Sequence, residues 1–201
     1  MEYQFNQNPL DAIANMGFAV TWKLIDLGLS RSMDANVEAF LTEAETVRFL
    51  QDVLGNNPSR TDEIIAVLCE ADDPFSLRKR IHALAENEPT DRRVQLRKWR
   101  AYALCKLLQE IEDDPFGHSE LIWFWSTGLS LGDRITEDYG SDAAKISAYY
   151  SRQGAARAIA ANQAFLAAET KELSARAAQE NDIACCKAEQ SFPTKEGTTC
   201  C

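Results

Sequence analysis

The 201-residue chain has no stretch of about 18 consecutive apolar residues, the length that a membrane-spanning helix needs. The segment from Met1 to Asn6 also lacks the basic and then apolar pattern of a signal peptide. From these two absences we expect no stable membrane insertion and a cytoplasmic location.

Strand signals are nearly absent as well. No long run alternates apolar and polar residues with many Val, Ile and Thr, and no Asn-Gly or Asp-Gly turn joins such runs. Apolar residues recur instead at helical spacing, most clearly between residues 91 and 111. The pattern predicts an all-α protein, an irregular multi-helix bundle or helical-hairpin array of about seven to nine helices without a significant sheet.

Local features indicate where some of these helices begin and end. Pro9 is expected to open a first helix whose apolar face continues to Gly28. Thr42 and Glu45 have the spacing of a capping box. The alanine-rich stretch from about residue 142 to 184 predicts one helix or two helices that pack through small side chains.

Two clusters of side chains within the predicted helices call for an explanation, one basic and one aromatic. Basic residues crowd the first half of the helix predicted over 91–111: Arg92, Arg93, Arg97, Lys98 and Arg100. Cations are unfavourable near a helix start, so we expect them to meet carboxylates such as Glu86 or Glu88. The aromatic run Trp123-Phe124-Trp125 is expected to pack in the core rather than to form a binding platform.

Signatures of catalysis are scarce. The chain contains no His-Glu-x-x-His and no Gly-x-x-x-x-Gly-Lys motif, and its only histidines are His82 and His118. A general base needs an orienting partner, for which Glu86 or Glu120 is available, so a cryptic hydrolase stays an alternative. We interpret both histidines as surface or partly packed side chains, and we expect a protein that is not an enzyme and has no cofactor.

The six cysteines are predicted to be reduced, because no export signal accompanies them. Cys69 and Cys105 lie among apolar residues and are expected to act as small hydrophobic side chains. The vicinal pairs Cys185-Cys186 and Cys200-Cys201 do not match the Cys-x-x-Cys spacing of zinc sites, so no metal site is expected. We expect a single helical domain over residues 1–187, with a potential division near 140, and a flexible cysteine-containing tail over 188–201.

Negative charge dominates the composition. Asp and Glu number 31 against 21 Lys and Arg, which gives a net charge of -10 and an isoelectric point near 4.7. Such a surface repels nucleic acid and attracts basic proteins. The sequence therefore predicts a basic protein partner and no nucleic acid.

Part of this charge lies in a repeated tetrapeptide. Asp-Asp-Pro-Phe occurs at Asp72–Phe75 and again at Asp113–Phe116. Each copy is typical of a helix start, with an aspartate at the N-cap and proline in the first turn. The two junctions and the residues before the second one form a predicted acidic partner-binding rim: Asp72, Asp73, Glu110, Glu112, Asp113 and Asp114.

A series of short motifs over about residues 18 to 139 resembles an uncharacterised family of small bacterial proteins thought to be immunity proteins of polymorphic toxin systems. The residues that carry the resemblance are Thr21-Trp22-Lys23, Gly28, Arg97-Lys98-Trp99, Leu104, Leu108, Asp114-Pro115, Glu120 and Trp123. In the family a Tyr-Pro pair follows the helix that Pro115 is predicted to open. This chain has Ser126–Leu129 in its place. The family has no established catalytic residues.

The resemblance implies a non-catalytic, toxin-neutralising protein that turns an acidic surface towards a basic partner, such as a toxin domain. The alternative is a helical scaffold or adaptor that is tethered through the C-terminal cysteines. The oligomeric state is not predicted by either interpretation.

Overall fold

The computed structural model describes residues 8–30, 39–55, 60–111, 117–126, 131, 143–180 and 182–183. Within these residues the chain forms nine α-helices and no strand, which confirms the all-α prediction. The helices are α1 (Pro9–Asn15), α2 (Trp22–Leu29), α3 (Glu43–Val53), α4 (Thr61–Leu68), α5 (Pro74–Glu86), α6 (Arg92–Glu110), α7 (Ser119–Ser126), α8 (Ala143–Tyr149) and α9 (Arg152–Ala177).

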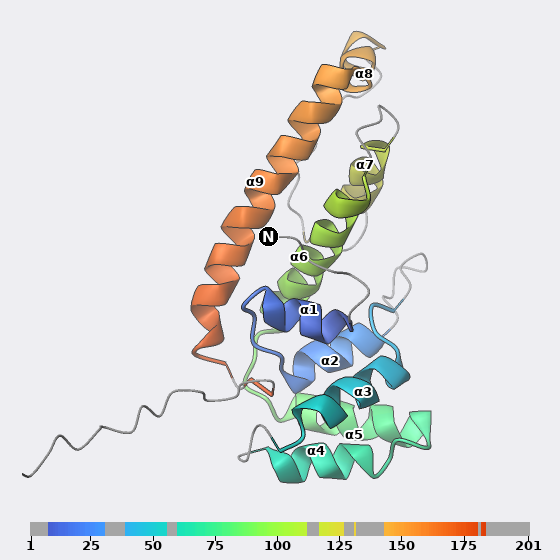
Figure 1. Cartoon of the computed structure of the whole chain (residues 1–201), viewed down its shortest axis with the longest axis vertical. Helices are drawn as coiled ribbons and strands as arrows, with labels where there is room; N and C mark the ends of the chain where they lie inside the picture. Colours follow the sequence, from blue (N-terminus) through green and yellow to red (C-terminus); the bar gives the residue numbers. More distant parts are fainter. Residues whose placement is uncertain are drawn as a thin grey trace, which may run out of the picture.

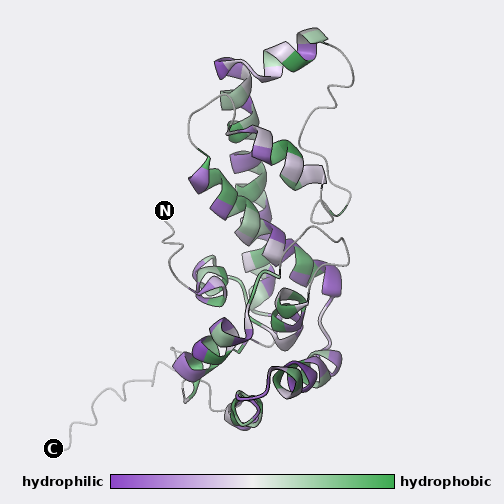
Figure 2. Cartoon of the chain, turned by 90° about the vertical axis from the view of Figure 1, so that its right-hand side faces the viewer, coloured by the Kyte–Doolittle hydropathy of each residue, from purple (hydrophilic) through white to green (hydrophobic). Residues whose placement is uncertain are grey.

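The two longest helices, α6 and α9, lie side by side and organise the rest of the molecule (Figure 1). Helices α1 to α5 gather around the N-terminal end of α6, and α7 and α8 lie towards the opposite end. Figure 2 shows hydrophobic and hydrophilic positions distributed around the same helices, as amphipathic packing requires. None of the described helices is both long and apolar enough to cross a membrane.

Several helix starts follow the local signals. The Thr42 hydroxyl accepts a hydrogen bond from the Glu45 amide at 3.2 Å, and the Thr42 amide donates to the Glu45 carboxylate at 2.8 Å. This reciprocal pair confirms the predicted capping box. Asp73 is the N-cap of α5, with Pro74 in the first turn, as the repeated tetrapeptide predicts. The second copy, at residues 113–116, lies outside the described residues.

The first predicted helix is wrong in its length, because the segment divides into α1 and α2. Gly17 has a φ of +79°, a left-handed conformation that ends α1. The Thr21 hydroxyl then accepts from the Leu24 amide at 3.1 Å and starts α2. Both helices bury apolar residues in one core. The apolar spacing therefore continues across the break, and the sequence pattern does not indicate that the helix ends there.

The main core surrounds Trp99, which is fully buried. Its indole nitrogen donates to the Leu24 carbonyl at 2.8 Å, and its ring stacks on Phe40 with centroids 5.2 Å apart. Gly28 of α2 lies against this ring, because a Cβ at that position would be 2.3 Å from the Trp99 Cζ2 atom. The indole therefore fixes the approach of α2 to α6.

A second, smaller core buries Leu104 of α6 and Leu121, Phe124 and Trp125 of α7, and Phe165 of α9 packs against it. The aromatic run is thus buried at Phe124 and Trp125, as predicted, whereas Trp123 is 59% exposed. The alanine-rich stretch forms two helices, since Ser151 accepts from the Gly154 amide at 3.1 Å and starts α9 anew.

Candidate functional site

Two members of the basic cluster of α6, Arg97 and Arg100, find their carboxylates on α9. Arg97 donates to both Glu169 oxygens at 2.9 and 2.7 Å, and Arg100 donates to Glu169 at 2.5 Å. Arg97 also reaches Glu172 at 2.8 Å. The predicted partners are therefore wrong: Glu86 and Glu88 pair instead with Lys23 and Arg60.

Burial and charge act in opposite directions at Glu169, whose side chain is 6% exposed. Burial alone would raise its pKa, but the hydrogen bonds from Arg97 and Arg100 outweigh burial and hold the pKa below the ordinary value of 4.5. The Arg100 guanidinium lies 4.9 Å from the Phe165 ring centroid and 5.8 Å from that of Trp125. These charged groups are paired with one another within the protein, so we interpret this cluster as a structural link between α6 and α9.

A second buried cation, Lys98, holds the segment that follows α9. Its ammonium donates to the Ala19 carbonyl at 2.7 Å and to the Glu180 carboxylate. The Val20 amide donates to Asp182 at 2.9 Å, and the Ile183 amide donates to the Val20 carbonyl at 2.7 Å. Burial lowers the pKa of Lys98, although Glu180 opposes this shift. This group is also structural.

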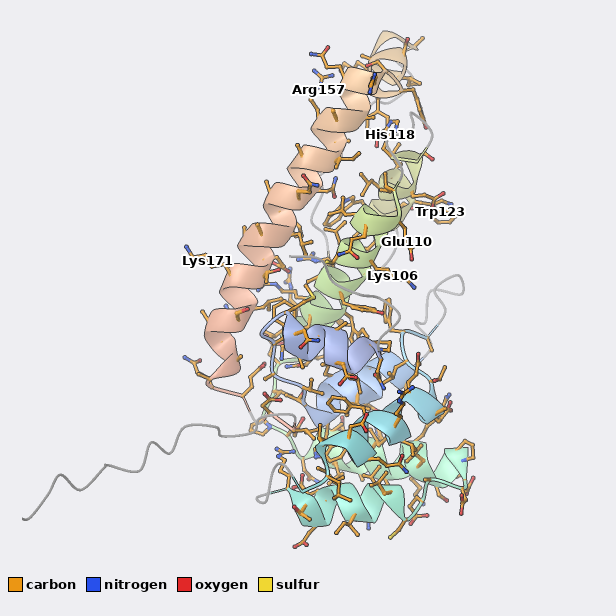
Figure 3. The ribbon with its side chains drawn as sticks, in the orientation of Figure 1. Lys106, Glu110, His118, Trp123, Arg157 and Lys171 are labelled. Atoms are coloured by element: carbon orange, nitrogen blue, oxygen red, sulfur yellow. The ribbon has the colours of Figure 1, made fainter. Side chains whose placement is uncertain are left out.

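The described members of the predicted acidic rim do not lie together. Asp72 and Asp73 are exposed in the turn between α4 and α5, at the lower end of Figure 1. Glu110 ends α6 higher in the molecule, 3.9 Å from Lys106 (Figure 3). Glu112, Asp113 and Asp114 lie outside the described residues. The structure therefore separates Glu110 from the α4–α5 turn.

The two aspartates of the α4–α5 turn differ in their contacts. The Asp73 carboxylate accepts from the Ser76 hydroxyl at 2.6 Å and from the Phe75 amide at 3.1 Å. These two hydrogen bonds lower the pKa of Asp73. Asp72 is exposed and makes no hydrogen bond to any residue that the structure describes. We name this pair the acidic lip.

That difference predicts different responses to neutralisation. We expect Asp73→Ala to lower the thermal midpoint of unfolding, because it removes the side-chain cap of α5 and the negative charge at the helix start. Asp72→Ala should leave the midpoint unchanged. Differential scanning calorimetry of both variants checks this, and equal midpoints would show that Asp73 contributes nothing as a cap.

Beside the acidic lip, α2 and α5 enclose a shallow pocket of about 440 Å³. We name it the α2–α5 pocket, and its lining residues are Asp26, Leu29, Ser30, Phe75, Arg78, Lys79 and His82. Phe75 is 76% exposed at its edge. Among the exposed large hydrophobic side chains of the described residues it is the most accessible, ahead of Trp123 at 59%. Sequence reasoning used this residue only as part of a helix-start motif and missed its exposure.

The basic side chains of the α2–α5 pocket differ in their contacts. Arg78 pairs with Glu43 at 2.5 Å, and His82 Nδ1 lies 3.3 Å from both carboxylate oxygens of Asp26. Lys79 is exposed and makes no ion pair with a described residue. Its charge is therefore available to a ligand that enters the pocket.

The Asp26–His82 pair does not form a nucleophilic triad with the neighbouring serine. The Ser30 hydroxyl donates to the Asp26 main-chain carbonyl at 2.7 Å, at the C-terminal end of α2. Glu86, the orienting residue considered from the sequence, bonds to Lys23 instead. His82 is exposed as predicted, but its carboxylate neighbour is one that the sequence did not indicate.

His118 is fully buried, which corrects the expectation of a surface or partly packed side chain. Its Nε2 atom lies 3.0 Å from the Tyr149 carbonyl, and its ring packs on Tyr149 and Tyr150 with centroids 4.5 and 5.4 Å away. The contacts of His118 with the two tyrosines link the start of α7 to the end of α8. It gives the imidazole no open access to a substrate.

Sequence reasoning also missed a Gly-x-Ser-x-Gly pattern at residues 128–132. In hydrolases this pattern places its serine on a sharp turn between a strand and a helix. Here the preceding described segment is the helix α7, and of the pattern itself the structure describes Leu131 alone. The pattern therefore lacks the strand that a nucleophile elbow requires.

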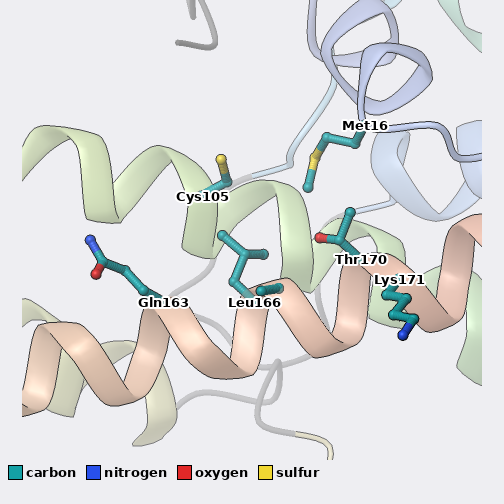
Figure 4. A pocket seen from close by; sticks show the side chains of 7 residues that line it. Met16, Cys105, Gln163, Leu166, Thr170 and Lys171 are labelled. Atoms are coloured by element: carbon teal, nitrogen blue, oxygen red, sulfur yellow. The ribbon is translucent and has the colours of Figure 1, made fainter. Parts of the chain in front are cut away.

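A second pocket of about 390 Å³ lies between α9, α6 and the C-terminal end of α1. Met16, Cys105 and Leu166 contribute apolar groups to it, and Lys171 lies at its edge (Figure 4). Burial raises the pKa of the Cys105 thiol, which keeps it in the unreactive protonated form. The pocket thus offers little specific chemistry.

Cysteines provide no metal site in the described part of the chain. Cys105 is buried, as predicted, whereas Cys69 is exposed, contrary to the expectation of an apolar setting. Cys185, Cys186, Cys200 and Cys201 lie outside the described residues, as does the predicted tail. Among the described residues no group of three or more His, Cys, Asp or Glu side chains could hold a metal ion.

A scan against models of protein families, a search of curated proteins and a search of solved structures each find no match for the chain. The resemblance to immunity proteins stays a prediction. The acidic lip and the α2–α5 pocket are the candidate functional site.

Proposed function

We propose that the chain is a non-catalytic partner-binding protein that docks on a basic protein through Phe75 and the acidic lip. The supporting observation is the 76% exposure of Phe75 between two carboxylates and an open pocket. Aromatic side chains supply much of the energy at interfaces, where they become desolvated at the centre of the contact. The net charge of -10 would draw a basic partner towards this surface.

Neutralisation of a toxin is the specific form of this function that we propose. A basic toxin domain is the kind of partner that the acidic lip would attract, and the resemblance described above points in the same direction. The competing form is an adaptor that holds a partner of another charge. An acidic partner would favour the adaptor over the immunity protein.

Replacing Phe75 by alanine should weaken partner binding about 30-fold or more, which corresponds to the loss of about 2 kcal/mol at an interface hot spot. The matched control is Trp123→Ala, because Trp123 is also exposed, at 59%, but lies on α7. Proteins captured from the native cell are compared between wild type and the two variants. A genuine partner is retained by wild type and Trp123→Ala and lost by Phe75→Ala; equal retention by all three contradicts the proposal.

Charge should govern the association rate. Rim charges act on encounter and are screened by salt, so association should slow between about 0.05 and 0.5 M salt, where the screening length falls from roughly 14 to 4 Å. Asp72→Asn should slow association further, whereas Glu110→Gln, which removes the same charge far from the α4–α5 turn, should not. Stopped-flow measurements with the captured partner test this. Equal rates for Asp72→Asn and wild type would exclude the acidic lip.

A further inference from the structure

His118 and Tyr149 are joined by two hydrogen bonds. The His118 Nε2 atom lies 3.0 Å from the Tyr149 carbonyl oxygen, and the Tyr149 hydroxyl donates to the His118 carbonyl at 3.2 Å. His118 directly precedes α7, whereas Tyr149 is the last residue of α8. Both side chains are buried. The pair therefore links two helices through groups that water does not reach.

The contact with Tyr149 determines which imidazole nitrogen carries the proton. A carbonyl oxygen only accepts hydrogen bonds, so we assign the proton to Nε2 and the lone pair to Nδ1. Nδ1 is buried and has no hydrogen-bond partner among the described residues. A second proton on this ring would therefore lie on a nitrogen that neither water nor a described acceptor contacts.

Charged side chains on the surrounding helices do not compensate for such a proton. They are Glu110 of α6, Glu120 of α7, Lys145 of α8, and Arg152 and Arg157 of α9, and all five are exposed. In the described part of the chain none of them forms an ion pair with His118. The Tyr149 and Tyr150 rings, with centroids 4.5 and 5.4 Å away, would attract a cation. That attraction is weaker than the cost of burying an unpaired charge.

The attachment of α8 to α7 depends on this pair. Tyr149 is the one buried residue among the described side chains of α8. His118 lies between α7 and α8, towards the upper end of Figure 3. Only Tyr150 and Ser151 separate α8 from α9 in the sequence, and α8 packs on α9. Loss of the His118 contact would thus part α8 from α7 and leave it next to α9.

We propose that His118 makes the contact between α7 and α8 depend on pH between neutral and mildly acidic conditions. Uptake of a proton at Nδ1 requires that the ring leave its buried position, where the charge would have neither water nor a described counter-charge. This movement breaks the hydrogen bond to Tyr149, and α8 separates from α7. The inference does not rest on the proposed partner binding, and it concerns the opposite end of the molecule from the α2–α5 pocket.

Hydrogen–deuterium exchange of the full chain tests this proposal. Histidine ordinarily titrates near about pH 6.5, and a group that binds a proton only in the open state raises the open population about 10-fold per pH unit below that value. Between about pH 7.5 and 5.5 the protection of the α8 amides, relative to an unfolded peptide at the same pH, should therefore fall about 10-fold. Protection in the first half of α6 should not change with it.

Two variants distinguish the histidines, because the chain contains only His82 and His118. His118→Gln keeps an amide donor for the Tyr149 carbonyl and takes up no proton, so α8 should be equally protected at both pH values. His82→Gln is the matched control, which should lose α8 protection in acid as wild type does. The proposal is overturned if wild type keeps the protection of α8 at the lower pH, if α6 loses protection equally, or if His118→Gln responds as wild type does.

A second measurement on wild type covers the case in which His118→Gln leaves α8 unprotected already at the higher pH. The ring C–H resonances of the two histidines are followed by NMR over the same pH range. The exposed His82 should titrate while the helices stay protected. His118 should become charged only together with the loss of α8 protection. Titration of His118 while α8 stays protected would refute the proposal.

Discussion

Replacing Glu169 by alanine should lower the free energy of unfolding by about 3–5 kcal/mol, the range seen when one partner of a buried ion pair is removed. Glu169 is the carboxylate that Arg97 and Arg100 share, and the Arg100 side chain is 1% exposed. The variant removes the carboxylate that lies 2.5 Å from the buried Arg100 guanidinium. Urea unfolding at neutral pH measures the loss, and a loss below about 1 kcal/mol would place Glu169 among ordinary surface pairs.

The same residue should make stability depend on pH. The folded-state pKa of Glu169 lies below its ordinary value of 4.5. Between these two values the unfolded chain binds more protons than the folded chain, so stability rises with pH. The contribution is full above about pH 5 and is lost as the pH falls through the folded-state pKa. Glu169→Gln should flatten this acid limb of the stability curve, whereas Glu172→Gln, at an exposed carboxylate, should change it less.

The second large effect is expected at Gly28. An alanine Cβ there would lie 2.3 Å from Cζ2 of the buried Trp99 ring, far inside van der Waals contact. Overpacking of this kind costs about 1–3 kcal/mol and sometimes more. In an open helix the same substitution would stabilise by roughly 0.5–1 kcal/mol, so the sign of the change identifies the contact.

A second-site variant verifies the cause of the Gly28 effect. Trp99→Leu removes the ring that the new methyl group would strike, so Gly28→Ala should destabilise a Trp99→Leu background much less than it destabilises the wild type. The coupling energy from a double-mutant cycle should be about 1–3 kcal/mol. Additive effects would show that the two positions do not meet.

Local sequence determined the helix starts and left their tertiary partners open. Thr42 and Asp73 could be predicted as caps because their partners lie within three residues. The carboxylate partner of Arg97 is 72 residues away on α9, and no local pattern indicates it. Proximity in sequence favours Glu86 and Glu88, which precede α6, but in the structure they pair with Lys23 and Arg60.

The candidate site shows the same division between local and tertiary information. Asp72 and Asp73 were identified by charge, and they do lie at an exposed turn. The pocket beside them depends on α2 packing against α5, so His82 meets Asp26 across 56 positions of sequence. The exposure of Phe75 likewise depends on which face of α5 is covered. A motif that places Phe75 in a first helical turn does not reveal that face.

The burial of Lys98 and Arg100 has a consequence for the order of events on the ribosome. Both side chains are fully buried or nearly so, yet their carboxylates belong to residues 180 and 169. At about 5–20 residues per second, the roughly 80 residues that separate positions 100 and 180 take about 4 to 16 s to synthesise. During that interval the carboxylates that bond to Lys98 and Arg100 in the folded protein are still missing. We therefore expect the N-terminal half to complete its packing around these two side chains only after α9 and the segment up to Ile183 have been synthesised.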